Sequence, residues 1–250
     1  NGFYLDFEAS GNLGNDARGG TDYAESNLAA MDQSTDSPTN NFCTVNSWST
    51  GNGANLTLAE GNLHATGGSG HNRAMCTHLI PSGGKWYWEV FVKTVGGTHP
   101  AIGVDPANTN HENSVYVGQD NVTVGGWGIY GGGGVNGTSG GGGTYDSYTT
   151  GDMIGVAVDV DNNKIYFYKD GSAAVTSGQA YEPLVAGLDI VPAGSMFNSG
   201  VQIYNFGQDG TFAGEKTAAG NADGEGYGNF FHSVPSGFLA LCTKNMGGNS

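Results

Sequence analysis

The sequence predicts an all-β protein, built as a two-sheet antiparallel β-sandwich with long glycine-rich loops. Three observations predict this fold. Short apolar runs alternate with polar residues at the two-residue period of strands, turn residues separate these runs at loop-length intervals, and no long stretch shows the 3.6-residue period of a helix. The 250 residues include 46 glycines without the regular spacing of collagen, so much of the chain is expected in turns and loops.

The clearest single element is a predicted β-hairpin over residues 151–171, GDMIGVAVDVDNNKIYFYKDG. Asp161, Asn162 and Asn163 form its polar turn, since Asn and Asp tolerate the left-handed backbone that tight turns need. A lone hairpin is only marginally stable in water, so this one requires a sheet around it and a second sheet against it. The residues expected on its buried face are Ile154, Val156, Val158, Ile165 and Phe167.

Two further hairpins are predicted, at 54–68 and at 72–95. Each contains two apolar runs separated by turn residues. Shorter strands are predicted at 3–7, 42–48, 99–106, 115–119, 125–132, 182–191 and 199–212. We expect residues 1–59 to supply an N-terminal strand and loops that pack on the same sandwich, and residues 60–245 to form the sandwich domain.

The charge of the chain limits its partners. The net charge is −15 at pH 7, and eight Lys plus Arg residues cannot form the basic surface that a nucleic-acid-binding protein needs. An acidic surface suits divalent cations or neutral partners such as glycans. No stretch reaches the roughly 18 apolar residues of a membrane span, so membrane insertion is not expected. Because no signal peptide or initiator Met is present, we expect Asn1 to lie inside a longer polypeptide or after a processing point.

The three cysteines are Cys43, Cys76 and Cys242, and they are widely spaced. No CxxC pair exists, which argues against a zinc site with thiolate ligands. Three buried free thiols are the favoured interpretation, and one disulfide remains the alternative.

Six segments carry a family resemblance. SGGKWYWEV (82–90), AIGV (101–104), GWGIY (126–130), the hairpin at 151–171, EPLV (182–185) and VQIYNFGQD (201–209) occur in the order and at the distances of the SPRY (B30.2-like) domain, which the chain resembles. The resemblance implies a concanavalin A-like jelly roll of two bent antiparallel sheets. It also implies recognition of proteins through loops, and it makes Glu89 similar to a framework residue of the family.

The ends of the chain resemble a narrower group. NGFYLDF (1–7), DSPTNNF (36–42) and GFLALCTKN (237–245) are similar to segments flanking SPRY-like modules in tail and fibre proteins of marine bacteriophages. This resemblance implies a non-enzymatic adhesion module on the virion surface or outside the cell. Its partners would be a host-surface glycan or protein and other virion proteins. Because such fibres are commonly trimeric, a homo-oligomer is expected.

Two alternatives to adhesion remain open. One is a structural decoration or filament subunit that self-associates through its loops. The other is a SPRY-type protein-interaction domain of a cellular or secreted protein.

Aromatic residues around the glycine-rich stretch at 131–143 are the candidates for ligand binding. With almost no side chains, the stretch itself is expected to be a flexible surface loop. Aromatic side chains on polar loops are typical of glycan or protein recognition, and packing under the loop is the alternative. The candidate residues are Tyr116, Trp127, Tyr130, Tyr145 and Tyr148.

Catalysis and cofactors find little support in the sequence. No facing carboxylate pair and no GxSxG motif is present, so no catalytic residue is assigned and no enzyme is expected. Calcium is the one ion for which candidates exist. Asp6, Asp16 and Asp22 surround the first loop, where solvated carboxylates are the alternative.

Overall fold

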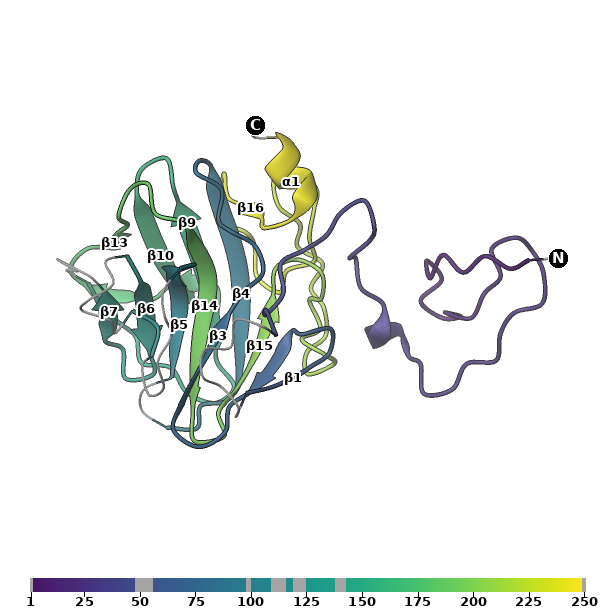
Figure 1. The fold of residues 1–250 in the computed structure, drawn as a ribbon, viewed down its shortest axis with the longest axis horizontal. Helices are drawn as coiled ribbons and strands as arrows, with labels where there is room; N and C mark the ends of the chain where they lie inside the picture. Colours follow the sequence, from purple (N-terminus) through teal and green to yellow (C-terminus); the bar gives the residue numbers. More distant parts are fainter. Residues whose placement is uncertain are drawn as a thin grey trace.

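The computed structural model describes residues 2–47, 56–97, 100–108, 116–118, 125–137 and 143–248, and it confirms an all-β antiparallel sandwich (Figure 1). The larger sheet has the spatial order β1 (Thr57–Ala59), β2 (His64–Thr66), β15 (Val201–Asn205), β4 (Lys85–Thr94), β9 (Met153–Asp159), β10 (Lys164–Lys169) and β11 (Ser172–Ala173). Two short strands also join it, β13 (Glu182–Pro183) beside β10 and β16 (Leu239–Ala240) beside β4.

The second sheet has the order β3 (His71–Met75), β14 (Ile190–Phe197), β5 (Ala101–Pro106), β6 (Trp127–Tyr130) and β7 (Val135–Gly137). A separate pair consists of β8 (Thr144–Tyr145) and β12 (Val175–Ser177). The helical elements of the described chain are a 3-10 turn, η1 (Ala30–Asp32), and the short α1 (Thr243–Gly248). None of the helices in the described ranges is long and apolar enough to cross a bilayer.

The predicted hairpin at 151–171 is confirmed as β9 and β10. The two strands pair in register from Asp159↔Lys164 to Ile154↔Lys169. The turn works as its sequence predicts, because Asn163 has a φ of 52° and the side chain of Asp159 accepts the N–H of Asn162 at 3.0 Å. All five residues predicted on its buried face are at most 2% exposed.

Strand β4 is buried on both faces, which the alternation of its sequence did not predict. Its inward residues, Trp86, Trp88, Val90 and Val92, lie between the two sheets. The opposite face is covered by the chain after β15, which runs beside β15 and β16 (Figure 1). On that face Tyr87 packs on Phe230 and Phe91 packs on Phe212, with ring centroids 5.3 and 5.9 Å apart.

Several strand predictions are wrong. Within 42–48, Phe42 and Val45 form only isolated bridges, and 182–191 is divided between β13 and the start of β14. Residues 72–95 do not form a hairpin, because β3 and β4 lie in different sheets and the intervening loop crosses between them. The strand predicted at 3–7 is not formed, and Phe3 and Phe7 are 60% and 53% exposed. Of the predicted strand at 115–119, residues 116–118 are not a strand and the rest lies outside the described residues. The predicted hairpin at 54–68 is confirmed by the pairing of β1 with β2.

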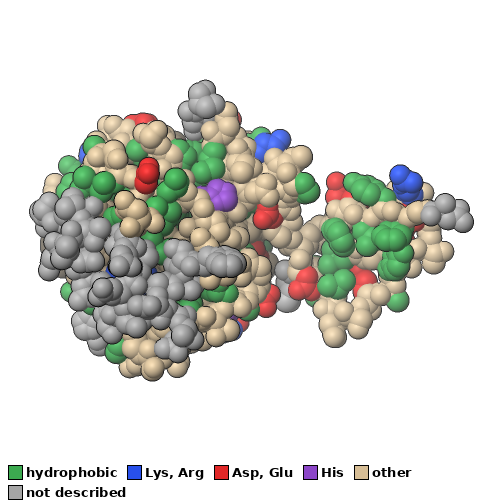
Figure 2. Space-filling model, viewed as in Figure 1, with side chains coloured by type: hydrophobic (Ala, Val, Ile, Leu, Met, Phe, Trp, Pro, Cys, Tyr) green, Lys and Arg blue, Asp and Glu red, His purple; other side chains and the backbone are tan. Residues whose placement is uncertain are grey.

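The N-terminal segment extends away from the sandwich (Figure 1). It folds on itself through backbone hydrogen bonds and through the rings of Phe3 and Tyr23, whose centroids are 4.9 Å apart. Hydrophobic side chains gather on its surface (Figure 2). Ser34 and Thr35 bond it to the sandwich, because the Ser34 hydroxyl and the Thr35 N–H donate to the carbonyl of Gln208 at 3.4 and 3.1 Å. The division of the chain into an N-terminal part at 1–59 and a sandwich domain at 60–245 stays a prediction.

Gly103 in β5 shows how tightly the second sheet is packed. A Cβ added there would collide with the carbonyl oxygen of Trp127 on β6 and lie 2.9 Å from the Cα of Gly128. Both atoms belong to a paired strand and cannot move aside. Gly103→Ala is therefore expected to lower the free energy of unfolding by about 1–3 kcal/mol in urea titrations. Gly224→Ala, at a site open to solvent, should change it by less than about 0.5 kcal/mol, and an equal effect of both would contradict this account.

Candidate functional site

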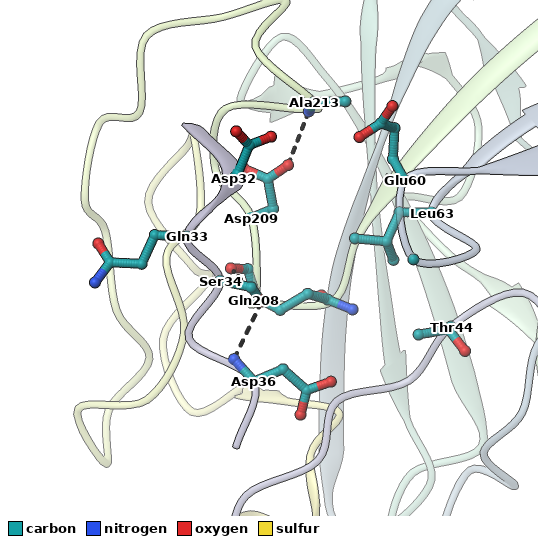
Figure 3. Close-up of a pocket in the computed structure, with 11 residues that line it drawn as sticks. Asp32, Gln33, Ser34, Asp36, Thr44, Glu60, Leu63, Gln208, Asp209 and Ala213 are labelled. Atoms are coloured by element: carbon teal, nitrogen blue, oxygen red, sulfur yellow. Dashed lines mark hydrogen bonds between the residues drawn. The ribbon is translucent and has the colours of Figure 1, made fainter. Parts of the chain in front are cut away.

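The main candidate site is an acidic pocket of about 310 Å³ beside the larger sheet (Figure 3). Four separate parts of the chain line it: the segment 32–36, Thr44, the β1–β2 turn at 60–63, and residues 208–213. Its carboxylates belong to Asp32, Asp36, Glu60 and Asp209. No Lys, Arg or His is among the residues that line it, so nothing in its described wall neutralises them.

Buried hydrogen bonds hold the floor of the acidic pocket. Gln208 is 3% exposed, and its side chain donates to the carbonyl of Cys43 at 2.7 Å and accepts the N–H of Phe206 at 2.8 Å. The Asp209 carboxylate accepts the N–H of Ala213 at 2.8 Å (Figure 3). It also accepts the N–H of Thr211 at 2.8 Å. Because Asp209 is committed to the loop, and because the exposed Asp32 carboxylate accepts the N–H of Ala29 at 2.7 Å, the exposed Asp36 and Glu60 are the carboxylates best placed to meet a partner.

An apolar cavity of about 280 Å³ adjoins the acidic pocket along the same segment. The two share Asp32, Gln33, Ser34 and Asp36 as lining residues. The rest of the apolar cavity is formed by three hydrophobic residues of the N-terminal segment, Phe7, Leu13 and Leu28. The segment 32–36 therefore has a carboxylate-lined space on one side and a hydrophobic space on the other.

Three of the five aromatic residues predicted to bind a ligand are core residues. Trp127 is 2% exposed and lies against Gly137, where no side chain would fit. Tyr145 and Tyr148 are each 3% exposed; the Tyr145 hydroxyl donates to Glu182 at 3.1 Å, and that of Tyr148 donates to a backbone carbonyl at 2.6 Å. Side chains with so little surface cannot meet a ligand in this conformation, so the structure assigns them to packing under the glycine-rich stretch.

Tyr116 and Tyr130 are the two predicted residues that keep exposed surface. Both are half-buried and pack on a small hydrophobic cluster at the outer side of the second sheet. The Tyr116 ring lies 5.1 Å from that of His71, and the Tyr130 ring covers Gly134. Part of the stretch 131–143 thus forms β7 in place of the predicted loop, while residues 138–142 lie outside the described residues. A ligand role for the two tyrosines stays a prediction.

The three calcium candidates do not converge on one point. Asp6 accepts a hydrogen bond from the backbone of its own turn. Asp16 accepts the N–H of Tyr4 at 3.0 Å, which lowers its pKa, and Asp22 accepts the side-chain amide of Asn12 at 2.9 Å. Over the described ranges, no three His, Cys, Asp or Glu side chains are placed to hold a metal ion. The loop hydrogen bonds of these carboxylates explain their positions without an ion.

The acidic pocket was not predicted from the sequence. Its carboxylates come from positions as far apart as Asp32 and Asp209, and no local motif marks any of them. The available signal was global: 23 acidic against eight basic residues requires that acidic side chains meet somewhere without a counter-charge.

Comparison with protein-family models identifies a known domain in the chain. Residues 85–208 match the family model of the SPRY domain. Among solved structures, the chain resembles the SPRY domain of human HERC1, with 17% identity, a TM-score of 0.47, and coverage of 60% of this chain and 91% of that one. A human SPRY domain is 16% identical, with a TM-score of 0.45 and coverage of 60% of this chain and 93% of that one. Stonustoxin is 19% identical, with a TM-score of 0.49 and coverage of 65% of this chain and 27% of that one. None of the curated proteins matches the chain.

The matched range coincides with the centre of the sandwich. It begins at Lys85, the first residue of β4, contains the hairpin of β9 and β10, and ends at Gln208 in the floor of the acidic pocket. The other residues of the pocket lie outside this range. SPRY domains are protein-interaction modules and are generally non-catalytic. Residues 85–208 of this chain form a SPRY domain.

Proposed function

We propose that this chain is a non-enzymatic protein-interaction module whose acidic pocket binds a basic side chain of a partner polypeptide. The observation that carries the proposal is the lining of the pocket, four carboxylates with no Lys, Arg or His. An Arg guanidinium forms paired, charge-assisted hydrogen bonds with carboxylates, and a Lys ammonium supplies a single point charge. Arg is therefore the preferred residue.

The apolar cavity beside the pocket adds a second requirement. Phe7 and Leu28, on its rim, are 53% and 49% exposed and offer surface for a hydrophobic side chain. The two cavities lie side by side because they share the segment 32–36. One partner side chain in the acidic pocket and another in the apolar cavity would therefore come from residues close together in the partner's sequence. We therefore propose a partner segment that has an Arg near a large apolar residue.

Binding of short labelled peptides to the full chain tests this proposal. A peptide containing Arg and Leu is expected to bind, whereas peptides with Glu for Arg, or Ser for Leu, bind at least about tenfold more weakly. Because the carboxylates are exposed, raising the salt concentration from 50 to 500 mM should weaken binding several-fold. Fluorescence anisotropy gives the affinities. Equal binding of the Arg and Glu peptides would show that the pocket is not the site.

A location on a virion or outside the cell, as an adhesion module, remains part of the proposal. The similarity of the chain ends to segments of phage tail and fibre proteins supports it, together with the acidic, glycine-rich composition. The partner would then be a host-surface protein with exposed basic residues, or a glycan. Antibody labelling of purified particles tests the location, and light scattering of the full chain tests the expected homo-oligomer.

A further inference from the structure

Two of the three cysteines share one face where the segment 42–46 pairs with the end of β3. Val45 and Cys76 face each other in an antiparallel bridge, framed by backbone hydrogen bonds of 2.7 and 2.8 Å. Side chains two residues apart on an extended chain point to the same side. Cys43 therefore lies on the side of Val45, which is also the side of Cys76.

The two thiols are buried close to a histidine. Cys43 and Cys76 are 0% and 3% exposed, and each shifts the pKa of the other. The hydroxyl of Thr77 lies 3.8 Å from the Cys43 Sγ and 3.0 Å from the His78 Nδ1. Since Thr77 is exposed, the Cys43 sulfur is only one side chain below the surface.

The surroundings of Cys43 favour its thiolate. Burial by itself raises the pKa of the Cys43 thiol, but the hydrogen bonds with Cys76 and His78 outweigh it and lower this pKa to about 5. Burial lowers the pKa of His78, yet its contact with Cys43 raises the value overall. Burial and the neighbouring Cys43 both raise the pKa of Cys76. These shifts favour the thiolate on Cys43 and the proton on His78 and Cys76, and the thiolate is the form that attacks oxidants.

We propose that Cys43 and Cys76 are a reversible redox pair that closes to a disulfide when hydrogen peroxide reaches Cys43. In the first step the Cys43 sulfur attacks one peroxide oxygen, the O–O bond breaks, and the products are a sulfenic acid and, after protonation, water. In the second step the Cys76 sulfur attacks Cys43, the S–O bond breaks, and the hydroxide takes the Cys76 proton and leaves as water. Two thiols lose one electron each, and one peroxide gains both.

The disulfide would join two segments that are otherwise linked only by packing and hydrogen bonds. Cys43 lies directly behind the acidic pocket, because its carbonyl accepts the Gln208 side chain that forms the pocket floor. The neighbouring Thr44 lines that pocket. The redox pair does not depend on the proposed binding function, so a failure of either leaves the other standing.

Peroxide treatment of the full chain under native conditions tests the pair. The reduced chain should present three thiols to an alkylating reagent after unfolding, and the oxidised chain only one, on Cys242. Peptide mapping should find the Cys43 peptide joined to the Cys76 peptide, and dithiothreitol should restore three thiols. Three thiols after peroxide, or a bridge that involves Cys242, would overturn the proposal.

Three variants separate the roles of the groups. Cys76→Ala should form no bridge within the chain and should leave a sulfenic acid on Cys43, which dimedone traps. Cys242→Ala should form the bridge as the unaltered chain does, and failure of this control to do so would count against the pair. His78→Asn should slow bridge formation at pH 6 at least about tenfold, because Cys43 loses the partner that stabilises its thiolate. An unchanged rate would overturn the assignment of Cys43 as the attacking thiol.

Discussion

Replacing Glu89 by alanine is expected to lower the free energy of unfolding by about 4 kcal/mol. Glu89 is fully buried on the outward face of β4. Its carboxylate accepts the N–H groups of Phe231 and His232, both at 2.8 Å, the Tyr87 hydroxyl at 3.2 Å and the Asn205 side-chain amide at 3.4 Å. Alanine would remove this acceptor from all four donors, and it would leave the buried Tyr87 hydroxyl and two half-buried backbone N–H groups without it.

The same substitution should loosen the cover of the larger sheet. The two backbone hydrogen bonds to Glu89 hold the segment 230–232 against β4. Tyr87 and Phe91 lie on the same face of β4 as Glu89 and are buried. Urea unfolding followed by circular dichroism measures the stability. Hydrogen exchange should show that the amides of Phe231 and His232 lose protection before those of β9.

Two control variants separate the carboxylate from a general effect of lost charge. Glu89→Gln keeps one oxygen acceptor and should cost about half as much as alanine. Glu215→Gln removes an equal charge from an exposed ion pair with Lys93 and should change the stability by less than about 0.5 kcal/mol. A loss below about 1 kcal/mol for Glu89→Ala would show that water or other groups replace the carboxylate.

Local pattern predicted the elements whose partners are close in sequence. The hairpin of β9 and β10 needs only an alternating run, a polar turn and a second run, and all three are present in 151–171. Alternation also accounts for the inward residues of β4, because it assigns residues of one parity to the core. The resemblance to SPRY domains then predicted that these strands form a two-sheet sandwich.

Features that depend on distant parts of the chain were not predictable in this way. Apolar runs on either side of Pro81 resemble a hairpin, and nothing local shows that the loop changes sheets. The glycines that follow Trp127 in the sequence suggest an open loop with an exposed ring. In the structure the Trp127 ring packs on Gly137, where there is no room for a side chain. The acidic pocket needs residues that meet only after folding, so its position could not be predicted even though the excess of acidic residues was plain.

Reversing two charges of the pocket, with Asp36→Lys and Glu60→Lys together, is expected to weaken binding of an Arg-containing peptide by about a hundredfold or more. Both residues are exposed lining residues from opposite sides of the pocket. Each replacement removes an attractive charge and adds a repulsive one facing the peptide. Anisotropy titrations at 50 mM salt would measure the change, and an acidic peptide should gain affinity for the double variant.

A matched double variant, Asp189→Lys with Glu225→Lys, makes the same change of net charge at exposed positions outside the pocket. It should alter the affinity by no more than about threefold, because charges separated by more than a Debye length of roughly 10 Å are largely screened. Equal losses in both variants would mean that the peptide responds to the net charge of −15 and not to the pocket. A loss confined to the pocket variant, with circular dichroism unchanged, would place the partner's basic side chain beside the segment 32–36.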